Sequence, residues 1–333
     1  MERSQLIDAF LGQNGWGAAR RRHLAGDASD RKYLRLFDDQ TSETAILMDA
    51  PPGQDIDNFI RITDYLRQNQ LNAPRILAQD APHGLLLLQD FGDALFARLL
   101  QSQPELETTL YRAAVDVLIK LHRSTPPRGL LDYSAEVMAE FISPVFEFYP
   151  GHKPQMAAVQ SELHALLHKH CTDPPVIALR DYHAENLIWL PENTGTQRVG
   201  LLDYQDAVLA QPAYDLVSLL QDARRDVSAE SQAKMIRYYT DRIKADKNAF
   251  QLNYALQGAQ RNLRIIGIFA RLCTVAAKPG YLDLIPRVWR NLQQNLTHPE
   301  LGRLNDLVSA ALPAPSPAIL EQLRTQCPPN PTP

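Results

Sequence analysis

Cysteine is scarce in this sequence of 333 residues, which contains only Cys171, Cys273 and Cys327. No two of them have the CxxC spacing of a zinc or redox site, and a set of three spread this widely does not indicate a disulfide framework. The sequence therefore predicts buried or incidental thiols, which suit a reducing cytosol.

Long apolar runs and a strong charge imbalance are also missing. No uncharged stretch approaches the roughly 20 apolar residues that a membrane helix needs. The N-terminus, Met-Glu-Arg-Ser-Gln-Leu-Ile-Asp, lacks the basic start and apolar run of a signal peptide. A net charge of −4 does not favour binding to nucleic acid or to a membrane. We therefore expect a cytoplasmic protein without nucleic-acid or membrane partners.

The chain is long enough for two domains, and its apolar pattern changes near residue 90. Before that point, short strand patterns and two helical patterns predict a small mixed domain. The helices are expected at 3–12 and 55–68, and the strands at 33–37, 44–48, 75–78 and 85–89.

Longer helical patterns follow residue 90 and predict a second domain over residues 91–312. The helices are expected at 104–122, 135–148 and 155–170 and through most of 213–311, with short strands at 186–190 and 198–202. The remaining segment, 313–333, has seven prolines in 21 residues and is expected to be irregular.

Residues 179–206 carry the most informative pattern in the chain. Asp181 is followed five positions later by Asn186, and Asp203 comes seventeen positions after that, at the end of an apolar strand pattern. Phosphoryl transfer from ATP needs one carboxylate that orients and deprotonates the attacking hydroxyl, and an amide and a second carboxylate that hold magnesium. We assign the first role to Asp181 and the second to Asn186 and Asp203.

Each motif has a simpler interpretation when taken alone. A D-x-x-x-x-N sequence is often a polar turn, and Asp203 could cap a helix or lie in a surface turn. An ionised aspartate at the end of a buried strand is, however, unfavourable without a partner. Because Mg²⁺ prefers carboxylate and phosphate oxygens, the two motifs in this order favour catalysis.

The two motifs resemble the superfamily that includes protein kinases and aminoglycoside phosphotransferases. Asp181, Asn186 and Asp203 match its catalytic aspartate, its metal-binding asparagine and the aspartate of its DFG triplet, which here reads Asp-Tyr-Gln. Leu179 replaces the protein-kinase histidine and no APE-type segment follows, so a protein substrate is not expected. The resemblance implies ATP and Mg²⁺ as cofactors. It also implies a bilobal α+β fold like that of protein kinases, with a five-stranded antiparallel sheet in the small lobe and a mostly helical large lobe.

Further blocks resemble a narrower family, the bacterial anomeric kinases of N-acetylmuramate and N-acetylglucosamine. That resemblance implies phosphorylation of the sugar C1 hydroxyl in cell-wall sugar recycling. Asp215, in a Tyr-Asp-Leu motif, matches an aspartate that braces the catalytic loop through backbone N–H groups. The blocks are residues 179–191, 200–207, 214–227, 260–263, 267–272 and 284–289.

The nucleotide side departs most from the kinase pattern. Residues 26–33 lie where a loop over the phosphates belongs, but they contain one glycine and could be a plain hairpin turn. Met48 stands where the third strand of kinases has a phosphate-binding lysine; the alternative is that this strand is shifted in register relative to the kinase pattern. We expect Lys32, Arg31 or Arg35 to replace that lysine. The residues predicted to bind nucleotide are Ala28, Ser29, Asp30, Arg31 and Lys32, with Gln89, Asp90 and Phe91 at the hinge.

An arginine-rich segment predicts the acceptor side. Arg261, Arg264 and Arg271 fall within about 80° of one another on a helix. Such a face suits a carboxylate, as in the lactyl group of N-acetylmuramate, although a solvated or subunit-facing stripe is the alternative. Further acceptor candidates are His183, Arg224 and Asp206, of which the last could instead cap a helix.

Two other functions stay open. The acceptor could be an aminoglycoside, choline or another small alcohol, or the protein could bind nucleotide without turnover, which Met48 alone supports. We expect a monomer that binds ATP and a small amino sugar. The preference between the two sugars and between ATP and GTP is not predicted.

Overall fold

The computed structural model describes residues 2–24, 31–50 and 56–329, and the chain divides into two compact units. The first unit comprises residues 1–117 and 185–206, and the second comprises 118–184 and 207–333. The sequence predicted two domains that are each continuous in the chain, at 1–90 and 91–312. Compactness instead groups the hairpin at 185–206 with the N-terminal sheet.

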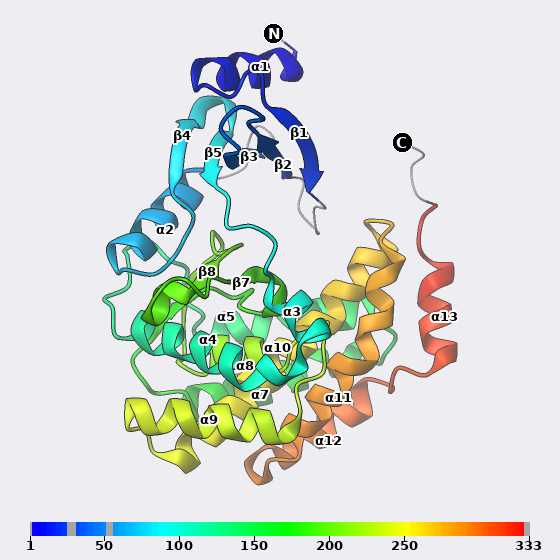
Figure 1. Ribbon diagram of the computed structural model, residues 1–333. Coiled ribbons are helices and arrows are strands. Elements are labelled where there is room, and N and C mark those ends of the chain that lie inside the picture. The colour runs from blue at the N-terminus through cyan, green and yellow to red at the C-terminus, as the bar shows by residue number, and fades with distance from the viewer. Residues whose placement is uncertain (1, 25–30, 51–55, 330–333) are drawn as a thin grey trace. The chain divides into compact units, whose positions relative to one another are not determined.

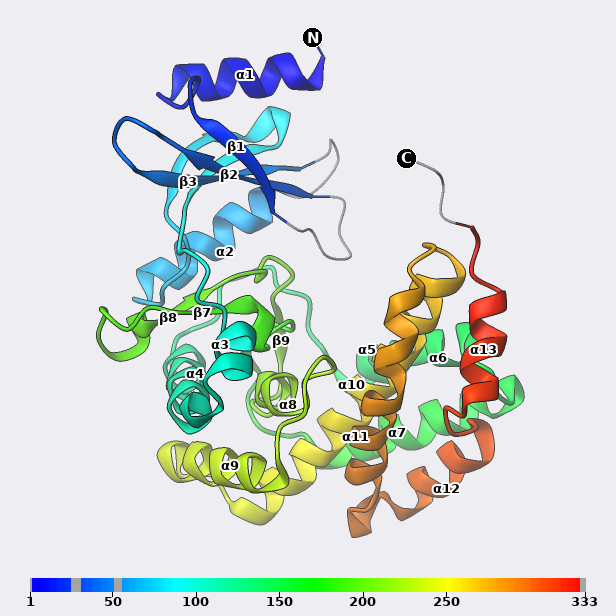
Figure 2. The ribbon, with the colours of Figure 1, turned by 45° about the vertical axis from the view of Figure 1, so that its right-hand side comes forward.

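A five-stranded antiparallel sheet forms the centre of the first unit, with its strands in the order β1-β2-β3-β5-β4 (Figure 1). The helix α1 (Arg3–Gln13) lies along one face, and α2 (Ile56–Gln68) lies on the other side of the sheet (Figure 2). Leu36 and Leu47 pack with Phe10 and Leu11 of α1 in a shared apolar cluster. The strands are β1 Arg20–Leu24, β2 Lys32–Phe37, β3 Thr44–Asp49, β4 Ile76–Asp80 and β5 Leu85–Gln89.

A second hairpin, β7 (Leu187–Trp189) with β8 (Val199–Leu201), belongs to the first unit although it comes late in the sequence. The backbone N–H of Leu201 donates to the carbonyl of Asn72 at 2.9 Å, and that of Trp189 donates to Ala94 at 2.8 Å. Gly200 leaves room for an aromatic ring, because a Cβ added there would lie 2.8 Å from the ring of Phe91. These contacts fix the segment that holds two of the predicted site residues.

The helix α10 (Lys247–Thr274) is 28 residues long and is the central element of the second unit (Figure 2). Two of its glycines permit close packing. A Cβ on Gly267 would clash with the backbone of Pro144 and Val145, and one on Gly258 would clash with Asn295. Around it lie α5 Ala135–Glu140, α6 Ser143–Phe148, α7 Met156–His170, α8 Tyr214–Leu220, α9 Ala229–Ile243, α11 Ile285–Leu296 and α12 Gly302–Ala311, and α4 (Glu107–His122) crosses from the first unit into this one. The short strands β6 Val176–Ala178 and β9 Val208–Ala210 pair with each other.

Three buried amides join α10 to its neighbours. Gln221, just after α8, accepts hydrogen bonds from Asn262 of α10 at 2.8 Å and from Asn295 of α11 at 2.9 Å. It also donates to the side-chain oxygen of Asn295 at 2.9 Å. All three side chains are at most 4% exposed. Because buried amides need partners, this amide triangle fixes the three segments relative to one another.

The C-terminal segment contains a helix, so the expectation of an irregular tail is wrong for residues 317–325. Helix α13 (Pro317–Thr325) begins after Ser316, whose side chain accepts a hydrogen bond from Ile319 N–H at 3.3 Å. Pro317 is tolerated because it occupies the first turn. Leu323 is fully buried in the core around α10, which supplies the apolar contact that makes this short helix stable.

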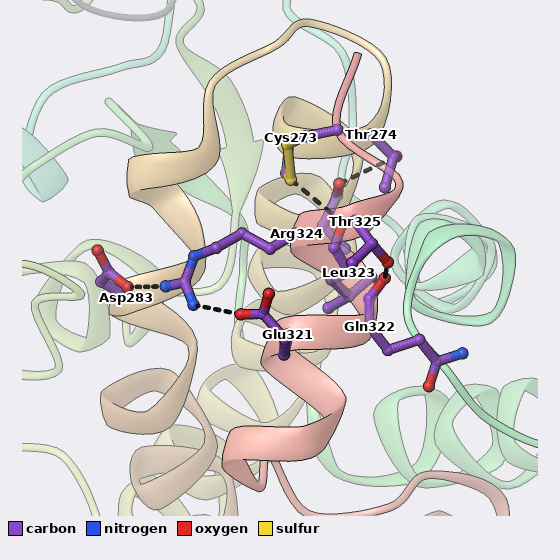
Figure 3. Close-up of a disulfide and its surroundings, with 10 residues drawn as sticks. Cys273, Thr274, Asp283, Glu321, Gln322, Leu323, Arg324 and Thr325 are labelled. Atoms are coloured by element: carbon purple, nitrogen blue, oxygen red, sulfur yellow. Dashed lines mark hydrogen bonds and ion pairs between the residues drawn. A yellow bond between two sulfur atoms is a disulfide. The ribbon is translucent and has the colours of Figure 1, made fainter. Parts of the chain in front are cut away.

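Two of the three cysteines form a disulfide, so the prediction of incidental thiols is wrong for Cys273 and Cys327. Their Cα atoms are 5.2 Å apart although the residues are separated by 54 positions. Nearby, Arg324 forms a 2.6 Å ion pair with Asp283 (Figure 3). Cys171 is a free thiol, and burial raises its pKa to about 12.

The predicted elements otherwise match the structure closely, with short additions and one break. The expected helix at 135–148 is interrupted between α5 and α6, since Pro144 cannot donate to the preceding turn and begins a new helix instead. No residue range was predicted for β1, β6, β9 or α3 (Phe96–Ser102). Across the described ranges, none of the helices has the length and apolar character to cross a membrane. The α+β class is confirmed.

Candidate active site

Asp181 lies in the loop that follows β6 in the second unit. Its backbone N–H donates to the carbonyl of Leu179 at 2.9 Å, and its carbonyl accepts from His183 N–H at 3.1 Å. Arg180, immediately before it, has a φ of 70°, in the left-handed region. A side chain as large as arginine adopts this conformation only where neighbouring groups hold it.

Those neighbouring groups come from helix α8. The carboxylate of Asp215 accepts the backbone N–H of Leu179 at 2.6 Å and that of Arg180 at 2.9 Å. This confirms the predicted brace of the catalytic loop. Asp215 is 1% exposed, and burial raises its pKa to about 7, against the lowering effect of the two N–H groups and of Arg261.

Ser218 and Arg261 extend this brace, and sequence reasoning missed the first of them. The Ser218 hydroxyl donates to the carbonyl of Arg180 at 2.8 Å and accepts from Nη2 of Arg261 at 2.8 Å. Ser218 comes three positions after Asp215, which puts both on one face of α8. That spacing was the available signal.

The predicted acceptor residues of the second unit have different surroundings. Arg261 is 5% exposed and directed at Ser218, whereas the Arg264 guanidinium lies 5.9 Å from the ring centre of Phe141. Arg271 is exposed in the last turn of α10, and Arg224 is partly exposed. His183 is 6% exposed. A carboxylate site on these residues stays a prediction.

Asn186 and Asp203 lie together at the base of the β7–β8 hairpin in the first unit. The backbone carbonyl of Asn186 accepts from Leu202 N–H at 3.0 Å, and the two side chains meet with Nδ2 of Asn186 3.5 Å from Oδ2 of Asp203. Asp203 has a φ of 55°, so the chain turns sharply at the end of β8. Gln205 Nε2 donates to Oδ1 of Asp203 at 2.8 Å and to Asp206 at 3.3 Å.

Tyr204 anchors this turn to helix α2. It is fully buried, its ring stacks on Phe59 with centroids 5.3 Å apart, and its hydroxyl lies 2.8 Å from the hydroxyl of Thr63. Asn58 also binds the carbonyl of Gln205. These contacts fix the two residues that follow the exposed Asp203.

The chemistry of this pair fits magnesium. The ion is commonly bound by one or two protein oxygens together with phosphates and waters, and here an exposed carboxylate stands beside an amide whose oxygen and nitrogen can exchange places by a flip. In the described part of the chain, no cluster of three or more His, Cys, Asp or Glu side chains forms a denser metal cage. Magnesium bound there would neutralise negative charge on phosphate oxygens.

The predicted nucleotide residues are only partly described. Ala28, Ser29 and Asp30 lie outside the described residues. Gln89 contacts Arg75, Asp90 forms a 2.8 Å ion pair with Arg35, and Phe91 packs against Gly200. Met48 is fully buried in β3, opposite Tyr33 of β2. Lys32 is exposed.

Comparison with known proteins decides the family. The model of a phosphotransferase enzyme family matches residues 20–249. The chain belongs to the phosphotransferase enzyme family. This membership confirms the predicted ATP-dependent phosphotransferase and places both candidate motifs inside the matched range.

Similar proteins cover most of this phosphotransferase. It is 38% identical to the N-acetylmuramate/N-acetylglucosamine kinase of Caulobacter vibrioides, over 91% of this chain and 95% of the relative. A choline/ethanolamine kinase family protein from Mesorhizobium loti has the same fold, with a TM-score of 0.66 and 15% identity over 92% of this chain and 98% of its own. An aminoglycoside phosphotransferase from Streptomyces rimosus, solved with ADP and streptomycin, gives a TM-score of 0.54 at 17% identity over 79% and 99% of the chains. The predicted protein-kinase-like fold is thereby confirmed.

Proposed function

We propose that the protein is an ATP-dependent sugar kinase that phosphorylates the anomeric C1 hydroxyl of N-acetylmuramate and N-acetylglucosamine. The observation that carries this proposal is the 38% identity to a kinase of that name across 95% of the relative. The similarity includes both candidate motifs and is not confined to the nucleotide side. A cytoplasmic location, a monomeric state and a role in cell-wall sugar recycling go with this proposal.

In the proposed reaction, Asp181 accepts the proton of the C1 hydroxyl as that oxygen forms a bond to the γ-phosphorus of ATP. The bond from the γ-phosphorus to the bridging oxygen breaks, and ADP leaves with the electron pair. A hemiacetal hydroxyl is more acidic than an ordinary alcohol, so the base has a modest task. The brace from Asp215 and Ser218 holds the backbone of Arg180, the residue just before the base.

Asn186 and Asp203 would hold the magnesium ion, with Gln205 orienting the Asp203 carboxylate. On the acceptor side we assign sugar contacts to His183, Arg224, Arg264 and Arg271, together with Asp206. Arg261 is assigned a positioning role, because its buried guanidinium donates to Ser218.

An acceptor panel tests the proposed substrate class. Release of ADP would be measured in a coupled assay with N-acetylmuramate, N-acetylglucosamine, glucose, kanamycin and choline, and the product position would be assigned by phosphorus-coupled proton NMR. The expected result is turnover with both N-acetyl sugars and a phosphate on C1. Turnover with kanamycin or choline alone, or phosphate on another hydroxyl, would replace this proposal with the corresponding acceptor.

An Asp181→Asn variant tests the assigned base. It should lower kcat by at least about 100-fold, because a general base typically contributes 10²–10⁴-fold. The affinity for an ATP analogue should stay close to that of the wild type, since Asp181 is assigned to the acceptor. Retained turnover would remove the role of base from Asp181.

A further inference from the structure

The sheet face opposite α1 has no basic residue on its central strand. Side chains alternate along a strand, and directly paired residues share a face. Met48 of β3 is paired with Tyr33 of β2 and with Leu86 of β5, and Met48 and Leu86 are fully buried. The phosphates of a nucleoside triphosphate therefore cannot receive a cation from β3. The candidates on or just before the neighbouring strand β2 are Arg31, Lys32 and Arg35.

Lys32 lies on the wrong face of the sheet for this role. It alternates with Leu34 and Leu36, which pack with the apolar cluster around α1. Its register partner in β3 is Asp49, and the Asp49 carboxylate is bound by Arg3 of α1. Lys32 is thus on the side covered by α1, away from Tyr33 and Met48.

Arg35 lies on the correct face but is already occupied by carboxylates. Its guanidinium binds Asp93 at 2.7 Å, Asp90 at 2.8 Å and the carbonyl of Gly92 at 3.0 Å. The Arg35 side chain is only 7% exposed. These bonds fix the chain that leaves β5, and they occupy both terminal nitrogens of the guanidinium with groups that are not phosphates.

Of the three candidates on or just before β2, Arg31 remains, and its partner Tyr33 also feels the charge of the metal-site carboxylate of Asp203. Two positions before Tyr33, it falls on the same side of the strand as Tyr33 and Arg35. Its side chain hydrogen-bonds with Tyr33, and Asp203 is close enough to act electrostatically on the same phenol. Burial raises the pKa of Tyr33 to about 12, so this phenol is neutral at pH 7 and can hold the guanidinium without competing for its charge.

We propose that Arg31 replaces the strand lysine of kinases as the cation that binds the nucleotide phosphates, and that Tyr33 is the positioning residue for its guanidinium. This inference rests on the proposed function for the presence of ATP, but not on which sugar is the acceptor. A planar guanidinium can bind two phosphate oxygens at once, which a lysine at the Met48 position could not do.

Binding measurements without an acceptor test the inference. Affinities for a non-hydrolysable ATP analogue and for adenosine would be measured with magnesium for the wild type and for Arg31→Gln. The matched control is Lys32→Gln, which removes the same charge one position away on the opposite face. Arg31→Gln should weaken the ATP analogue by about 10- to 100-fold, the value of one or two charge-assisted hydrogen bonds, and leave adenosine unchanged. Lys32→Gln should stay within about twofold of the wild type for both ligands.

Two further variants separate charge from position and keep the test decisive if Arg31→Gln does not fold. Arg31→Lys should recover part of the lost affinity, and Tyr33→Phe should weaken the ATP analogue less than Arg31→Gln while leaving adenosine binding intact. Equal weakening of adenosine, or an ATP affinity in the Arg31 variants equal to that of the wild type, would overturn the inference. Failure of the acceptor panel alone would overturn the sugar-kinase proposal and leave these affinities as expected.

Discussion

The hydroxyl of Ser218 donates a hydrogen bond of 2.8 Å to the backbone carbonyl of Arg180. Arg180 has a positive φ, and its N–H is bound by Asp215 on the same helix. One turn of α8 therefore holds both polar groups of the residue that precedes Asp181. The left-handed conformation of Arg180 is maintained by side chains that come from outside the loop.

Ser218→Ala should lower turnover as well as stability. The substitution removes the hydroxyl that the Arg180 carbonyl and a buried donor of Arg261 both use, which costs about 1–3 kcal/mol in the free energy of unfolding. The loss of kcat should reach up to about 100-fold, because small displacements of a catalytic group are costly, while KM for ATP stays constant. Urea denaturation and steady-state kinetics measure the two effects. Ser102→Ala is the control, since that exposed hydroxyl also binds a helix carbonyl; unchanged kcat in Ser218→Ala would reduce Ser218 to a purely structural role.

His122 should make the protein less stable in acid. It is partly buried against Tyr239, with its Nδ1 2.6 Å from the phenol oxygen, and removal of its ring from solvent lowers its pKa from 6.5 to about 3. The unfolded chain therefore binds a proton below pH 6.5 that the folded protein does not bind until about pH 3. The stability contributed by neutral His122 is complete above pH 6.5 and decreases by about 1.4 kcal/mol per pH unit as the pH falls towards 3.

The variant His122→Asn is compared with the wild type, because the asparagine side chain keeps a polar partner for Tyr239 but does not titrate. The difference in unfolding free energy between variant and wild type should change in favour of the variant from pH 6.5 to pH 4.5, as measured by urea denaturation at each pH. Near pH 8 the difference in unfolding free energy should no longer change with pH. Parallel curves over the acid range would show that His122 is accessible to protons in the folded state.

Removal of the Cys273–Cys327 disulfide should destabilise the second unit. The bond closes a segment of 54 residues, and loss of such a cross-link costs about 2–4 kcal/mol, mainly through the entropy of the unfolded chain. Cys327→Ser and wild-type protein unfolded with dithiothreitol should give the same lowered urea midpoint. Cys171→Ser is the control for loss of a thiol. A wild-type urea midpoint that is the same with and without dithiothreitol would show that the disulfide does not form in solution.

Gly267→Ala should separate α10 from α6. A Cβ there would meet the backbone of Pro144 and Val145, which cannot move aside as a side chain could, so we expect a loss of about 1–3 kcal/mol or more. Gly302→Ala is the matched control, because nothing lies within 4 Å of the added carbon at the exposed start of α12. It should stay within about 0.5 kcal/mol of the wild type. Comparable thermal midpoints for the two variants would contradict the close packing at Gly267.

The local elements could be predicted wherever the apolar period and a turn signal coincided. The Asp-Ala-Pro-His-Gly run at 80–84 is such a turn signal, and it ends in Gly84, which has a φ of 70° between β4 and β5. Helix α13 was not predicted, because the proline-rich composition of the tail outweighs the short apolar pattern of Ile319, Leu320 and Leu323. Its stability comes from packing on α10, which a window of nine residues does not reveal.

The site was predictable where one short segment carried the chemistry. The Asp215 brace was expected from its motif, whereas the Arg35–Asp90 pair joins positions 55 apart and became visible only with the sheet folded. The Cys273–Cys327 disulfide was not predicted either, because its cysteines are 54 positions apart in the sequence. The choice of Arg31 over Lys32 required the strand register, because adjacent residues in a strand point to opposite faces.

The amide triangle of Gln221, Asn262 and Asn295 limits how the helical unit can respond to ligands. Sliding α10 by one turn would move it by about 5.4 Å and leave several amide groups stranded in an apolar interior. No intermediate offset restores the same donors and acceptors, so the three segments have a single alignment. Within the second unit, α8, α10 and α11 should therefore respond to ligands as one rigid block, and adjustment there should come from rotamers and connecting segments.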